Sequence, residues 1–220
     1  MRAVTRIALV VLAAAVVVTG AAFAATGDPV KRHTAADMAK ARSIVFKLRE
    51  LGPGWTRDTA PQTDDNPRCS YFEIDESDLV ETGYAEATFN HSSGATLGSE
   101  ASVYKTVANA QATWGRHVRP ALARCLADEM RHEAAKDGDT VRIVSTGKLA
   151  LPKVSPRTAA FRILVRLTPK GRTTAIPLTF DLVFLERGRI LTFLGVITAG
   201  ATPPASLDLP FARLLDSRMR

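Results

Sequence analysis

Ser102 and Lys105 are the first residues of this 220-residue chain whose types and spacing could support catalysis. They match S-x-x-K, a motif in which a serine nucleophile and a lysine share one face of a helix. The residues around them alternate as a strand does, and residues three apart on a strand point to opposite faces. The S-D-N and K-T-G elements that accompany the motif are also missing from the sequence. We therefore predict no catalytic role for this pair.

Acidic residues and histidines are the next candidates, here for metal binding. A calcium loop needs a glycine and regularly spaced oxygen ligands, which the acidic run between positions 73 and 81 lacks. The histidines have no metal-site spacing, and His117 is expected to lie at the surface of a helix or half-buried. We expect a solvated acidic loop, no metal and no cofactor. The residues concerned are Glu73, Asp75, Glu76, Asp78 and Glu81, and His33, His91, His117 and His132.

The N-terminal segment is typical of an export signal. Arg2 and Arg6 precede an uninterrupted apolar run at 7–18, and residues 22–24 (Ala-Phe-Ala) have the form of a cleavage site. We predict a signal peptide at 1–24. An uncleaved anchor is the alternative, because residues 7–25 carry no charge and are almost long enough to span a bilayer. Either way residues 25–220 form one domain outside the cytoplasm, secreted or attached to the outer face of the cytoplasmic membrane.

Two cysteines in an exported domain usually pair, so a disulfide between Cys69 and Cys125 is expected. The alternative is two separate buried thiols. The bridge would tie a polar loop, predicted at 56–78, to a long helix. The cysteines have neither the CxxC spacing of a redox motif nor the partners of a zinc site.

That helix is predicted at 105–130, where apolar residues recur every three or four positions, and the rest of the chain is expected to pack around it. Pro120 lies inside it and predicts a kink or restart. Two shorter helices are expected at 34–51 and 209–218. Alternating residues predict a hairpin at 84–91 and 97–103, then strands at 141–151, 158–168, 173–186 and 190–198. This order favours an α+β fold, an antiparallel sheet with helices packed on it.

Charge is distributed unevenly along the chain. The net charge is +7, but residues 142–220 alone hold 13 Lys and Arg against 4 Asp and Glu. Arg162, Arg166, Lys170 and Arg172 form a candidate patch for an anionic partner, since the two arginines share one face of a strand and the others follow in its turn. The alternative is an ordinary solvated sheet face with basic hairpin tips.

Several motifs resemble those of small exported actinobacterial domains. They are Leu51-Gly-Pro-Gly-Trp55, Ser99-Glu-Ala-Ser-Val-Tyr104, Ala123-Arg-Cys-Leu126 and Arg187-Gly-Arg189. In layout the chain is similar to the extracellular sensor domain of mycobacterial serine/threonine kinases and to PsbP-like secreted proteins and lipoproteins. The resemblance implies a non-catalytic envelope protein that binds or senses a ligand. The chain has no kinase domain and no lipidated cysteine, so signalling and lipid anchoring are not implied.

Two kinds of partner fit this reading. One is an anionic envelope lipid or wall polymer, and the other is a small apolar ligand in a cleft between sheet and helix, where the resembling families often bind theirs. Nucleic acid is not expected outside the cytoplasm. A secreted enzyme with a site assembled from distant residues, or a structural envelope component, remains the alternative function.

Overall fold

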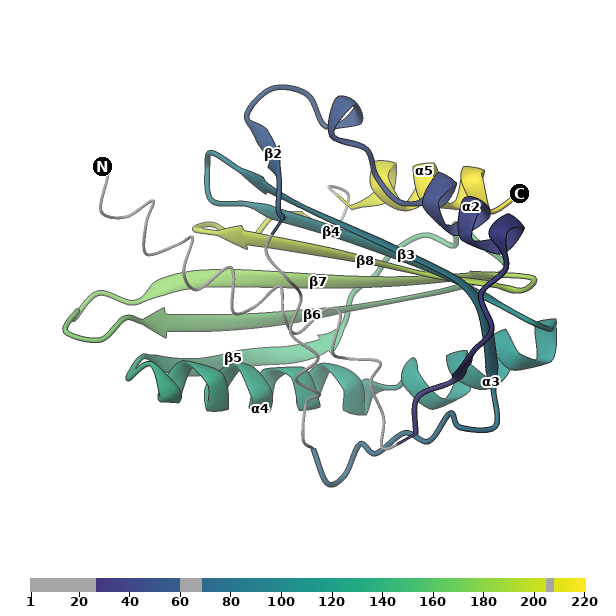
Figure 1. Ribbon diagram of the computed structural model, residues 1–220. Coiled ribbons are helices and arrows are strands. Elements are labelled where there is room, and N and C mark those ends of the chain that lie inside the picture. Colours follow the sequence, from purple (N-terminus) through teal and green to yellow (C-terminus); the bar gives the residue numbers. More distant parts are fainter. Residues whose placement is uncertain (1–26, 60–68, 205–207) are drawn as a thin grey trace.

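The computed structural model describes residues 27–59, 69–204 and 208–220 (Figure 1). The predicted signal peptide or anchor at 1–24 lies outside the described residues. Within them, four α-helices pack on one eight-stranded, mostly antiparallel sheet, which confirms the α+β prediction. Each helix in this part of the chain falls short of the length and apolar character needed to cross a membrane.

The sheet has the strand order β1-β3-β4-β8-β7-β6-β5, and β2 pairs with the far end of β3. Only the pairing of β1 with β3 is parallel among these strands. The predicted hairpin and C-terminal meander are both present. The strands are β1 (Val30–Lys31), β2 (Trp55–Arg57), β3 (Val80–His91), β4 (Thr96–Tyr104), β5 (Thr140–Lys148), β6 (Arg157–Thr168), β7 (Ile176–Arg187) and β8 (Ile190–Ala199).

The helix predicted at 105–130 is two helices, so the expectation of one long central helix is wrong, while the restart at Pro120 is confirmed. Helix α3 (Val107–His117) ends before Val118, and α4 (Pro120–Lys136) begins at the proline. Proline has no N–H to donate to the preceding turn, but its fixed φ suits the first turn of a new helix. The break lets α3 pack on β4 and β8 while α4 packs on β5 and β6.

The first predicted helix is shorter than its apolar pattern. Helix α2 (Ala35–Ile44) begins as expected, with Thr34 Oγ1 accepting a hydrogen bond from the Asp37 N–H at 3.1 Å. It ends seven residues early because Val45 is extended and Phe46 enters the core, where its N–H donates to Ser99 Oγ. The remaining apolar residues belong to a short 3₁₀ turn, η1 (Leu48–Glu50), and its neighbours.

Helices cover both faces of the sheet (Figure 1). On one face α4 packs on the meander, and the apolar core there includes Phe161, Phe184 and Phe193. On the other face α2 packs on β3 and β4, and α5 (Leu209–Met219) packs on β7 and β8, around Phe46 and Leu194. The meander strands are therefore apolar on both faces, but the β3–β4 hairpin is apolar only under α2.

Candidate functional site

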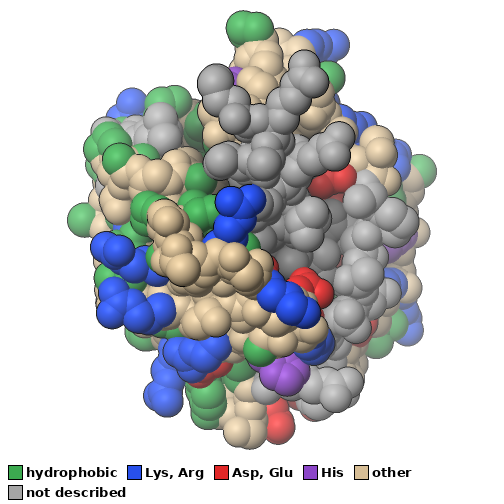
Figure 2. Space-filling model, turned by 90° about the vertical axis from the view of Figure 1, so that its left-hand side faces the viewer, with side chains coloured by type: hydrophobic (Ala, Val, Ile, Leu, Met, Phe, Trp, Pro, Cys, Tyr) green, Lys and Arg blue, Asp and Glu red, His purple; other side chains and the backbone are tan. Residues whose placement is uncertain are grey.

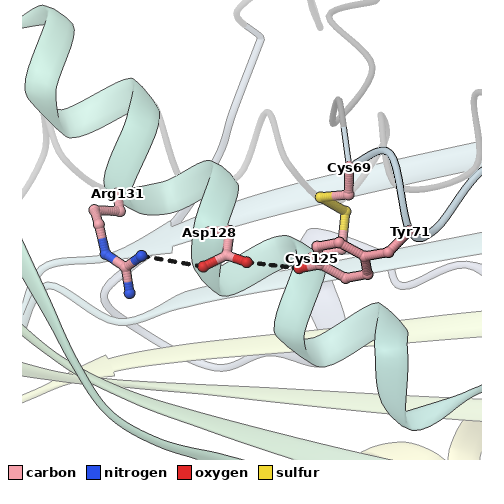
Figure 3. The surroundings of a disulfide bond; sticks show 5 residues. All are labelled: Cys69, Tyr71, Cys125, Asp128 and Arg131. Carbon is pink, nitrogen blue, oxygen red and sulfur yellow. Dashed lines mark hydrogen bonds and ion pairs between the residues drawn. A yellow bond between two sulfur atoms is a disulfide. The ribbon is translucent and has the colours of Figure 1, made fainter.

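The disulfide joins the loop before β3 to helix α4. Cys69 and Cys125 are bonded, with Cα atoms 5.7 Å apart, as the sequence predicts. Next to the bridge, Tyr71 Oη donates to Asp128 Oδ2 at 2.6 Å, and Arg131 Nη1 donates to the other oxygen of Asp128 (Figure 3). Burial, together with this hydrogen bond, raises the pKa of Tyr71 to about 12. These contacts fix the loop and present no reactive group.

Helix α3 holds the same loop through a buried pair. His117 Nε2 lies 3.1 Å from Glu76 Oε2, and the two side chains are 0% and 2% exposed. The expectation of a surface or half-buried His117 is therefore wrong. Beside it, Arg116 forms a two-point ion pair with Asp78 at the surface.

The expected solvated acidic loop is only partly confirmed. Glu73, Asp75 and Asp78 are exposed, but Glu76 and Glu81 are buried. Charge patterning could not separate them, because Glu76 is buried by a histidine 41 positions further along the chain and Glu81 lies within a strand.

Buried acidic groups also occupy the face of the β3–β4 hairpin opposite α2. Glu86 and Glu100 are direct cross-strand neighbours, and Tyr84 Oη donates to Glu86 Oε2 at 2.6 Å. Burial, reinforced by the charges of Glu86 and Glu81, raises the pKa of Glu100 well above its usual value. A protonated Glu100 can donate a hydrogen bond or a proton, so this pair has acid–base potential.

This polar pair was not identified from the sequence, although the alternation of polar and apolar residues on β3 is visible there. On β3, half-buried Tyr84, Glu86 and Thr88 alternate with buried Ala85 and Ala87. This pattern is typical of any strand that has one face exposed to solvent. Only the pairing register shows that two carboxyls meet. Among the described residues there is no group of three or more His, Cys, Asp or Glu side chains able to hold a metal ion.

The S-x-x-K pair is separated as its strand context predicts. Ser102 is buried within β4, whereas Lys105 follows the end of that strand and is exposed. The pair therefore lacks the shared helical face that the motif requires.

The structure divides the predicted basic patch. Arg162 is engaged internally: Nε and Nη2 donate to the two carboxylate oxygens of Asp181 on β7, and Nη1 donates to the Pro203 carbonyl. The hydrogen bonds to Asp181 stabilise the charged guanidinium and raise the pKa of Arg162, although burial opposes them. A guanidinium held in this way is not available to a partner.

The other three predicted residues, Arg166, Lys170 and Arg172, are exposed at the end of the molecule that carries the β6–β7 turn. Arg142 on β5 joins them, because it lies directly opposite Arg166. These four side chains make no ion pair with any residue that the structure describes. Figure 2 faces this end of the molecule, where Lys and Arg side chains outnumber the visible Asp and Glu side chains. We call Arg142, Arg166, Lys170 and Arg172 the basic face.

A scan of known family models finds no match for this chain, and a search of curated proteins finds none either. The geometry of the described residues therefore carries the functional argument.

Proposed function

We propose that this chain is an exported, non-catalytic envelope protein that binds an anionic polymer of the cell envelope through the basic face. The observation that carries the proposal is a group of four exposed cations at one end of the sheet that form no ion pair with the described residues. The export pattern at 1–24, the Cys69–Cys125 bridge and the resemblance to exported sensor and PsbP-like domains support the location.

The described residues favour an anionic partner over a small apolar one. On the α4 side of the sheet, Phe161, Phe184 and Phe193 belong to one apolar core with Leu122 and Leu126 of α4, and the ring centroids of Phe184 and Phe193 are 5.1 Å apart. Among the residues that the structure describes, the exposed large apolar side chains are dispersed over several elements, and only Val144 lies on a strand that contributes to the basic face. A membrane surface would be met by flanking apolar side chains, so a polymer is the better fit.

Cosedimentation of the exported protein with purified anionic wall polymer tests the proposal. Binding should weaken from low salt to about 1 M salt, because screening shortens the range of charge interactions to roughly 3 Å. The variant R142Q/R166Q/K170Q/R172Q should lose binding. The matched control is R32Q/R49Q/K105Q/R213Q, which removes the same charge from exposed residues elsewhere. Binding that withstands high salt, or that both quadruple variants retain, rejects the proposal, and binding only to anionic lipid vesicles replaces the polymer with a membrane.

A secreted enzyme is the second candidate, favoured by the Glu86–Glu100 pair. Its carboxyls come from neighbouring strands, and Glu100, whose pKa is raised by burial, lies beside Glu86 as a general acid lies beside a second carboxyl group. Release of soluble fragments from purified wall material by the wild type and not by E100Q would support this function. Equal release by both proteins would exclude Glu100 as the catalytic acid, and no release by either leaves binding as the activity.

A further inference from the structure

The arginines of β6 follow a pattern with one exception. Arg157 pairs with Glu186, and Arg162 pairs with Asp181, each partner being its direct neighbour on β7. Arg166 has Pro177 in that position, so β7 offers it no carboxylate. Its neighbour on the other side, in β5, is a second arginine.

Arg142 and Arg166 therefore form a like-charged cross-strand pair. Direct neighbours in an antiparallel pair point to the same face with Cβ atoms about 5 Å apart, and like charges placed there are destabilising. Both side chains are exposed, and neither forms an ion pair with any residue in the described ranges. A bulge follows Arg142, between Ile143 and Ser145, and bulges re-aim side chains at sheet edges.

We propose that Arg142 and Arg166 form a binding site for a phosphate group of the anionic polymer, an inference that rests on the proposed function. A guanidinium presents a planar fork of N–H donors that matches phosphate oxygens two at a time. Two such forks can converge on one phosphate, whose tetrahedrally arranged oxygens accept from more than one direction. The bound anion would also remove the repulsion between the two arginines.

The residues beyond the pair continue the site along the strands. Thr140 and Thr168 are direct neighbours two positions from the arginines, so they share the same face and place hydroxyls next to the site. Lys170 and Arg172 follow in the turn after β6, so cations continue beyond the arginine pair. A succession of cations fits a chain with repeated phosphates better than one isolated anion.

The test uses linear polyphosphate carrying a fluorescent label, titrated with the exported protein and followed by anisotropy. R142Q/R166Q should weaken binding at least tenfold, because it removes both guanidinium forks and their charge-assisted hydrogen bonds to the phosphate. R142K/R166K keeps the charge without the fork and should fall between that variant and the wild type. K170Q/R172Q should weaken binding less, and R49Q/R213Q should have no effect.

A second readout separates a binding role from a structural one. In the free protein R142Q/R166Q should raise the melting temperature slightly, since it removes the repulsion, and polyphosphate should stabilise the wild type more than this variant. If R142Q/R166Q binds polyphosphate like the wild type while K170Q/R172Q does not, the arginine pair is not the site and the proposed function stands. If the wild type binds neither polyphosphate nor wall polymer at low salt, the proposed function fails as well.

Discussion

Arg162 and Asp181 form a two-point ion pair, with Nε to Oδ1 and Nη2 to Oδ2 both at 2.5 Å. The two side chains are 16% and 1% exposed, and the guanidinium is also held by the Pro203 carbonyl. Four residues along the same strand, Arg166 has no such partner in the described chain. Two arginines that look equivalent in the sequence therefore have different roles, one inside the fold and one on its surface.

Substitution should separate these roles. R162Q leaves the Asp181 charge buried without its partner and should destabilise the fold by about 3 kcal/mol or more. R166Q should change stability by less than about 0.5 kcal/mol and weaken binding of the anionic polymer instead. Denaturant unfolding and cosedimentation of both variants measure the two effects. If R162Q is stable but binds the polymer weakly, Arg162 contributes to polymer binding and not to the stability of the fold.

Loss of the disulfide should destabilise the protein strongly. The bridge closes a loop with a sequence separation of 56, for which the chain-entropy model gives roughly 4 kcal/mol. C69S measures loss of the bridge, and C125S should cost more, because Cys125 is fully buried in the core under α4. Denaturant unfolding compares the two variants.

Peptide mapping without reductant is the control for the bridge itself. It should recover the Cys69 and Cys125 peptides linked, and free thiols at both positions would contradict the structure. Reduction of the wild type should reproduce the stability of C69S, since both leave the rest of the loop intact.

Much of the fold could be predicted from the sequence because local patterns determine it. Alternation located the β3–β4 hairpin and the meander, and Pro120 marked the start of α4. The end of α2 could not be read in this way. The helical apolar pattern continues past Ile44, but the chain leaves the helix because Phe46 is buried against β4, which is a tertiary effect.

The candidate sites depend on register, which a single sequence does not reveal. Arg166 was identified, but its neighbour Arg142 lies on another strand and becomes part of the basic face only through pairing. The same reason hid the Glu86–Glu100 pair. The internal pairing of Arg162 could not be read from the sequence, because its neutralising carboxylate is 19 positions away.

The buried Glu76 should contribute more than the exposed Asp78 to the stability that the loop before β3 gives the protein. E76Q replaces the carboxylate that faces His117 and should destabilise the protein by about 1–3 kcal/mol, because a buried polar group is left poorly matched. D78N breaks the surface pair with Arg116 and should cost less than about 1 kcal/mol. Thermal unfolding gives the ranking, and a costlier D78N would show that the surface pair holds the loop.

Asp208, directly before α5, should make the protein less stable as the pH rises. Both of its carboxyl oxygens are buried and accept no hydrogen bond from the described residues. Burial and the neighbouring Asp181 charge, opposed by Arg162, together raise the pKa of Asp208 to about 7. In the protonated form Asp208 can donate to Asp181.

The direction of the pH effect follows from proton binding. The folded protein keeps the Asp208 proton up to about pH 7, whereas the unfolded chain releases it near pH 3.8. The folded state therefore holds more protons in this window, and the contribution of Asp208 to stability is lost as the pH rises through it. Asp37 acts in the opposite direction, because its hydrogen bond from Arg189 lowers its pKa, so its contribution is lost as the pH falls.

D208N tests this assignment, since an amide can donate to Asp181 at every pH. The free energy of unfolding of D208N should vary less than that of the wild type between about pH 4 and pH 7, and D208N should be the more stable protein above pH 7. D37N is the control and should flatten the acid side of the profile only. Denaturant unfolding at a series of pH values measures both variants. Parallel stability profiles for D208N and the wild type would show that Asp208 is not the group that titrates in this window.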